Sequence, residues 1–66
     1  MTYRTIHETD FMLFLSSRLG DVIARRKADD REVYFQPGDA GNTLLDVLAE
    51  DPPDLALYRF IAPYFN

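Results

Sequence analysis

Apolar positions in the first half of the chain recur with the spacing of an amphipathic helix. Placed at about 100° per residue, six apolar side chains of this half share a stripe roughly 120° wide, the width of a core-facing helix surface. They are Phe11, Met12, Leu15, Leu19, Val22 and Ile23. Thr5 and Glu8 have the spacing of a capping box. The pattern therefore predicts a long helix from Ile6 to Ala28, with Thr9 or Asp10 as the alternative start.

Two details of this span refine the prediction. Arg25, Arg26 and Lys27 fall in the last predicted turn, where cations meet the negative end of the helix dipole, and two aspartates then end the helix. Leu13 and Phe14 lie outside the apolar stripe, and Phe14 shares the radius of Arg18, Asp21 and Arg25. One turn of the predicted helix is thus apolar nearly all round.

The second half predicts shorter elements. Val33 and Phe35 alternate with more polar neighbours, so Glu32 to Gln36 is typical of a strand, and Pro37 and Gly38 follow as a turn. Asn42 or Thr43 caps a short helix over residues 44–50. Asp51 caps a second helix over residues 52–61, with Pro52 in its first position and Pro63 after its end. Thr2 to Ile6 is expected to be a short strand or an extended arm. The predicted class is mainly α with one or two short strands.

The length and composition indicate that the fold needs stabilisation from outside the chain. Sixty-six residues form a single small domain over residues 1–66, and a chain of this size buries only about 60% of its unfolded surface. Cysteine is absent, which excludes disulfides, and His7 is the one histidine. The 47% hydrophobic content favours folding. Short apolar runs predict neither a membrane span nor a signal peptide, so we expect a cytoplasmic location.

The predicted strand raises the question of its partner. A single strand leaves its backbone N–H and C=O groups unpaired, so it requires a neighbour. Within the chain the candidate is Thr2 to Ile6, joined by a right-handed parallel crossover. The other candidate is the same strand of a second molecule, paired antiparallel across a two-fold axis. We favour the homodimer, because it also supplies missing core. The expected dimer interface is Leu13, Val33, Tyr34, Phe35 and Tyr58.

Charge and reactive side chains exclude several function classes. Residues 1–28 carry a net charge of +2 and the remainder −6, for −4 in total, so general nucleic-acid binding is unfavourable and eight acids after residue 28 are too few to imitate DNA. The acids have capping or solvation roles, and Ser16 and Ser17 have no evident base. Gly38 and Gly41 do not form a phosphate-binding loop. We predict no enzyme activity, no metal or other cofactor and no small-molecule substrate.

The remaining signal is a surplus of apolar side chains. Aromatic residues and arginines dominate interface energetics. We therefore expect Phe14, Arg18, Arg25 and Tyr34 to form a docking face for a larger protein. The predicted function is a small homodimeric regulator that binds and inhibits a larger protein, such as a transcription factor or enzyme subunit, of the kind that phages and mobile elements encode. The alternatives are a DNA-binding or transcription-linked accessory protein that uses residues 25–27, and a structural subunit of an assembly.

Overall fold

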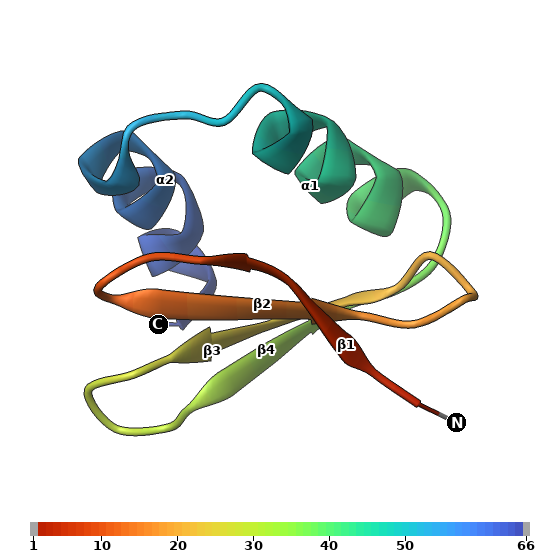
Figure 1. Ribbon diagram of the computed structural model, residues 1–66, viewed down its shortest axis with the longest axis horizontal. Helices are drawn as coiled ribbons and strands as arrows, with labels where there is room; N and C mark the ends of the chain where they lie inside the picture. The colour runs from red at the N-terminus through yellow and green to blue at the C-terminus, as the bar shows by residue number, and fades with distance from the viewer. Residues whose placement is uncertain (1, 66) are drawn as a thin grey trace.

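Four antiparallel strands occupy the first half of the chain and two helices the second. The computed structural model describes residues 2–65. The strands are β1 (Arg4–Glu8), β2 (Met12–Ser16), β3 (Val22–Arg26) and β4 (Glu32–Phe35), and the sheet order follows the chain order. The helices α1 (Asp39–Ala49) and α2 (Asp54–Ile61), with a 3-10 turn over Ala62–Phe65, lie together on one side of the sheet (Figure 1).

The predicted long helix from Ile6 to Ala28 is wrong, and so is the mainly helical class. Three strands and two turns occupy or overlap that span. In β2 the buried Met12, Phe14 and Ser16 alternate with the half-buried Leu13 and Leu15. Because nearly every position of this run is apolar, the two-residue period of a strand carries little polar contrast, and helical arithmetic fits it equally well. Leu13 and Phe14 are apolar but lie outside the helical stripe, and this is the sequence feature that argues against the helix.

Two turns that interrupt this span depend on local polar groups. In the β1–β2 turn, Thr9 Oγ1 accepts hydrogen bonds from the N–H groups of Phe11 at 3.1 Å and Met12 at 3.0 Å. In the β2–β3 turn, Gly20 has a φ of 86°, a left-handed conformation that favours glycine. Its N–H donates to the Ser17 carbonyl at 3.2 Å. Each turn replaces helical backbone bonds that the sequence pattern predicted.

The cations of residues 25–27 stand beside carboxylates and not at the end of a helix, so the dipole explanation is wrong. Arg25 pairs with Glu32 at 2.6 Å, across the β3–β4 ladder. Arg26 pairs with Asp29 at 2.7 Å in the following turn. Lys27 pairs with the Glu8 carboxylate of β1 at 2.6 Å. These bases therefore connect strands and turns.

The predicted strand at residues 32–36 is confirmed as β4 (Glu32–Phe35), but residues 2–6 as its partner within the chain are wrong. Its neighbour is β3, with Val22 opposite Phe35 and Ile23 opposite Tyr34 in an antiparallel register. The predicted parallel crossover to residues 2–6 is also wrong, because β1 pairs antiparallel with β2. The β1 register shifts between Thr5 and His7, which marks a bulge at Ile6.

Both C-terminal helices are confirmed, with different beginnings. Helix α1 starts at Asp39, earlier than predicted, with Gly38 as its N-cap. Helix α2 starts at Asp54 with Pro53 as its N-cap, so the predicted capping role of Asp51 is wrong. The early start of α1 brings the backbone of buried Gly41 against two other segments. A Cβ at this position would lie 2.5 Å from the Gly20 carbonyl oxygen and 2.7 Å from that of Gln36.

The core lies between the sheet and the helices. Its buried apolar members come from every strand except β1: Met12, Phe14, Val22, Ala24, Phe35, Leu44, Leu48, Leu57, Ile61 and Phe65. Phe14 is 0% exposed, so its predicted position on an outer surface is wrong. The Arg26 guanidinium lies 4.9 Å from the centre of the Phe65 ring and covers the end of the core.

Candidate functional site

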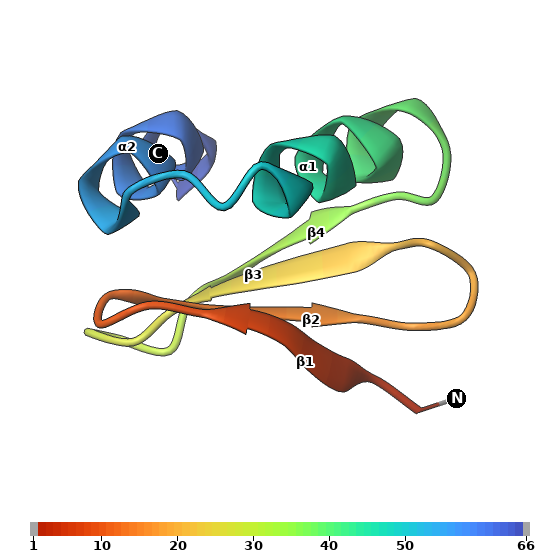
Figure 2. The same ribbon diagram turned by 45° about the horizontal axis from the view of Figure 1, so that its top comes forward.

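The face of the sheet opposite the helices is uncovered by any element of residues 2–65 (Figure 2). The strand registers place side chains on this face in two rows across the sheet. One row is Thr5, Leu15, Ile23 and Tyr34, and the other is Glu8, Leu13, Arg25 and Glu32. We call these eight residues the open face. Its centre is aliphatic, since three of its four central positions are leucine or isoleucine, and all three are half-buried.

The predicted site residues divide between this face and other parts of the fold. Leu13, Arg25 and Tyr34 come together on the open face, and Tyr34 is 53% exposed. Val33 and Phe35 belong to the covered side with Phe14. These three side chains therefore lie away from the open face.

The other two predicted residues lie away from the open face. Arg18 is exposed in the β2–β3 turn. Tyr58 of α2 lies with its ring centre 5.7 Å from that of Phe11. The predicted site is thus dispersed over the fold.

Asp21, which the sequence pattern placed within the predicted long helix, is a buried hydrogen-bond hub. Its side chain is 1% exposed. The Tyr3 hydroxyl at 2.5 Å and the Tyr34 hydroxyl at 3.0 Å donate to one carboxylate oxygen. The Ser17 hydroxyl and the Ser17 N–H, the latter at 3.3 Å, donate to the other. No sequence signal marks Asp21, because its donors come from three separate segments.

These donors determine the acidity of the cluster. Hydrogen bonds from the Ser17 and Tyr3 hydroxyls lower the pKa of Asp21 to about 2, against the opposing effect of burial. The hydrogen bond to Asp21 raises the pKa of Tyr3 to about 12. Burial and the same carboxylate raise the pKa of Tyr34. A carboxylate with so low a pKa is a poor general base near neutral pH, so Ser17 and Asp21 do not form an effective nucleophile and base pair.

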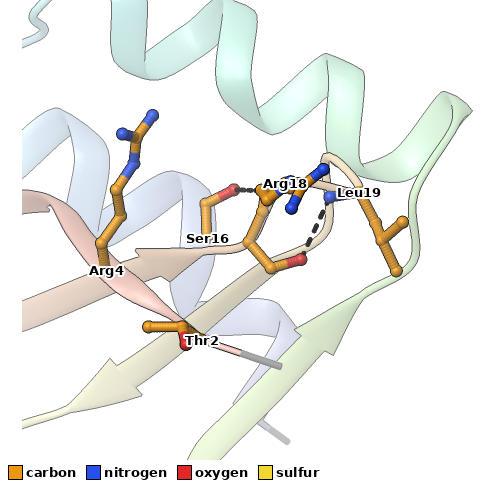
Figure 3. A pocket seen from close by; sticks show the side chains of 6 residues that line it. Thr2, Arg4, Ser16, Arg18 and Leu19 are labelled. Atoms are coloured by element: carbon orange, nitrogen blue, oxygen red, sulfur yellow. Dashed lines mark hydrogen bonds between the residues drawn. The ribbon is translucent and has the colours of Figure 1, made fainter.

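A groove of about 620 Å³ lies next to this hub. It is lined by Thr2, Arg4, Ser16, Ser17, Arg18 and Leu19, and we call it the arginine groove (Figure 3). One wall is the segment at residues 2–4, and the other is the β2–β3 turn at residues 16–19. Figure 3 shows Arg4 extending toward the side on which the helices lie. Asp21 joins the two walls, because it accepts from Tyr3 on one and from Ser17 on the other.

The polar groups of the groove differ in availability. The Ser16 hydroxyl donates to the Asp21 carbonyl at 2.6 Å, and Ser17 Oγ accepts from the Leu19 N–H at 3.2 Å, so both hydroxyls are engaged. Arg4 and Arg18 are exposed and take part in no ion pair within residues 2–65. The guanidinium groups are therefore the donors left for an outside ligand.

Residues 2–65 bring together no group of three side chains suited to hold a metal ion. The His7 ring lies 5.9 Å from that of Phe14. Across the same residues, no helix has the length and apolar character needed to cross a bilayer. No family model, curated protein or solved structure matches the chain. The open face and the arginine groove are therefore the candidate sites of this fold.

Proposed function

We propose that the protein is a non-catalytic interaction module of the cytoplasm, a homodimer that binds a larger protein and inhibits it by covering a working surface. The observation that carries the proposal is the open face. An antiparallel sheet with one solvated face ordinarily presents polar side chains on that face. Here Leu13, Leu15 and Ile23 occupy its centre instead, and burying aliphatic surface is worth roughly 25 cal/mol per Å².

A second copy of the chain is the occupant that the charges of the open face favour. Arg25 and Glu32 neutralise each other, and Glu8 is neutralised by Lys27, all within one molecule. Two such faces meet without net repulsion, and a two-fold axis makes the same patch serve both partners. The helices of both copies then remain on the outside, with their surfaces free for another protein.

The size of the open face predicts a weak dimer. Four strands about 4.8 Å apart span roughly 19 Å, and five residues of strand span about 17 Å. A standard interface buries about 800 Å² on each partner, which is more than this face offers by itself. We therefore expect a dimer dissociation constant in the micromolar range, which is weaker than that of a typical standard-size interface.

Pairing through strand edges is the less favourable route to a dimer. Strand β4 is an edge strand of four residues that begins with the exposed Glu32, and short, charged edges resist further pairing. Strand β1, at the other edge, carries the bulge at Ile6. Both features protect the sheet from growth beyond four strands.

Sedimentation equilibrium of the purified protein tests the dimer, over a range from about 1 µM to about 1 mM. Leu15→Glu places a charge at the centre of the open face, and we expect it to weaken dimerisation at least tenfold. Leu55→Glu is the matched control, because Leu55 is 56% exposed on α2. It should leave the association unchanged. A wild-type protein that remains monomeric over the whole range, with a native circular dichroism spectrum, would refute the dimer.

Affinity capture followed by an activity assay tests the regulatory role. A tagged copy retrieves its partner from cell extract, and the purified partner is then assayed with increasing amounts of the protein. We expect saturating inhibition at a fixed stoichiometry. Capture of nucleic acid would instead favour the DNA-linked alternative, which is weakened by the ion pairs of Arg25, Arg26 and Lys27. Capture of an assembly component whose activity is unaffected would favour a structural subunit.

A further inference from the structure

We propose that the arginine groove binds an acidic segment of the protein partner, with carboxylates on Arg4 and Arg18 and an aliphatic side chain against Leu19. This inference rests on the proposed role as an interaction module and names the chemistry of what is bound. It does not require the homodimer, because both walls of the groove come from one chain.

The availability of the two arginines is the first argument. Arg25, Arg26 and Lys27 each have a carboxylate within 2.7 Å, whereas Arg4 and Arg18 have none among residues 2–65. A guanidinium is a planar fork of donors that matches a carboxylate with two parallel hydrogen bonds. Two such forks on opposite walls of one groove suit a ligand that carries more than one carboxylate.

The rest of the lining favours a peptide over a nucleotide. Leu19 is 61% exposed and gives the groove an apolar contact for an aliphatic side chain. The six lining residues include no aromatic ring, so a nucleic-acid base would find no stacking surface. Arginine also binds phosphate, but this groove lacks the aromatic ring on which the base of a nucleotide would stack.

Asp21 makes the groove rigid and sets how much positive charge it presents. Its hydrogen bonds from Tyr3 and Ser17 hold both walls, so little ordering remains to be done when a ligand binds. Its own negative charge offsets one guanidinium. The second arginine then leaves the groove with a net positive charge, and we expect loss of either arginine to remove most of the binding.

The test uses a fluorescein-labelled octapeptide of alternating leucine and glutamate, measured by anisotropy at low salt with protein below its dimerisation range. A leucine and glutamine octapeptide is the ligand control. We expect saturable binding of the acidic peptide alone. Arg4→Gln and Arg18→Gln should each weaken it at least tenfold, and Arg59→Gln, which changes an exposed arginine outside the groove, should not. Tyr3→Phe, which releases one wall from Asp21, should weaken it severalfold.

Several outcomes would overturn the inference. They are no binding, equal binding of the glutamine peptide, equal loss in Arg59→Gln, or tighter binding of a labelled single-stranded oligonucleotide that Arg4→Gln abolishes, which would assign the groove to phosphate. Circular dichroism of each variant separates lost binding from lost fold. A wild-type protein that dimerises in sedimentation but ignores the peptide contradicts the groove alone, whereas one that stays monomeric up to about 1 mM but binds the peptide contradicts the dimer alone.

Discussion

Asp21 shows how a single residue can organise one end of a small fold. A buried carboxylate without a cation is costly unless donors surround it. Here four donors from Tyr3, Ser17 and Tyr34 satisfy it. None of these partners is near in sequence except Ser17, so composition and spacing provide no sign of the cluster. Predicting this cluster requires knowing the strand registers first.

The low pKa of Asp21 predicts acid sensitivity. A carboxyl group with a pKa of about 2 in the folded state and an ordinary value of 3.8 stabilises the fold fully above about pH 3.8. That contribution is lost as the pH falls toward 2. We therefore expect the free energy of unfolding to fall over this window, and Asp21→Asn to reduce both the stability at neutral pH and this acid slope. Urea unfolding followed by circular dichroism between pH 2 and pH 6 measures both.

A second carboxylate supplies the control for this experiment. The Arg26 guanidinium lowers the pKa of Asp29 to about 2 as well, but Asp29 lies in an exposed turn. Asp29→Asn should therefore keep the part of the acid slope that belongs to Asp21. The raised pKa of Tyr3 makes stability depend on pH in the opposite direction. The stabilisation of the fold that comes from protonated Tyr3 is present below pH 10 and is lost as the pH rises toward 12. An acid slope unchanged in Asp21→Asn would contradict the assignment.

At the scale of elements, the second half of the chain was predictable and the first was not. Strand β4 and both helices have polar contrast at the right period, and prolines mark the limits of α2. In β2 the outer positions Leu13 and Leu15 are apolar because they belong to the open face, so the alternation disappears. The same side chains that suggest an interface therefore conceal the strand.

The arginine groove was equally hidden at this scale. Arg18 was singled out for partner binding, but Arg4 was not. The two meet in one groove only because β1 and β2 form an antiparallel hairpin with Arg4 opposite Ser16. The predicted helix from Ile6 to Ala28 would have placed Arg18 several turns away from Arg4, which precedes it.

Gly41 links α1 to two segments of the sheet layer and provides a sharp test of that packing. Replacing glycine by alanine inside a helix ordinarily stabilises it by about 0.5–1 kcal/mol. Here the new Cβ would lie 2.5 Å from the Gly20 carbonyl oxygen, so the backbone must shift. We expect Gly41→Ala to lower the free energy of unfolding by roughly 1–3 kcal/mol. Thermal and urea unfolding measure the change.

The neighbouring helix position gives the comparison. Asn42 is exposed on α1, so Asn42→Ala should leave stability unchanged or slightly raised. If Gly41→Ala proves as stable as the wild-type protein, the close approach of α1 to the Gly20 carbonyl in the β2–β3 turn is contradicted.

Across the whole molecule, the charge separates by layer. The sheet layer, residues 2–38, has six acids and six bases, whereas the helical layer, residues 39–65, has five acids and one base. The negative excess of the protein therefore lies on the helices. A dimer formed through the open faces places the two acidic layers on opposite sides, where salt screens their repulsion.

This distribution predicts different salt responses for the two proposed contacts. Because the open face is neutral and aliphatic, its dimer dissociation constant should change less than about threefold between roughly 50 mM and 500 mM NaCl. Acidic-peptide binding in the arginine groove should weaken strongly over the same range. Sedimentation and anisotropy measured in parallel distinguish them. A dimer that dissociates in high salt would indicate an ionic interface elsewhere on the molecule.

The order of the elements along the chain has a consequence during synthesis. Each strand pairs with its immediate neighbour in sequence, so the meander can assemble while translation continues. The core-facing side of the sheet is covered only when the later segment folds back on it, because the buried Ile61 and Phe65 follow all four strands in the chain. A product truncated after α1 would keep its strands but would leave part of the core-facing side of the sheet exposed. It would be the species most prone to aggregate or to bind a chaperone.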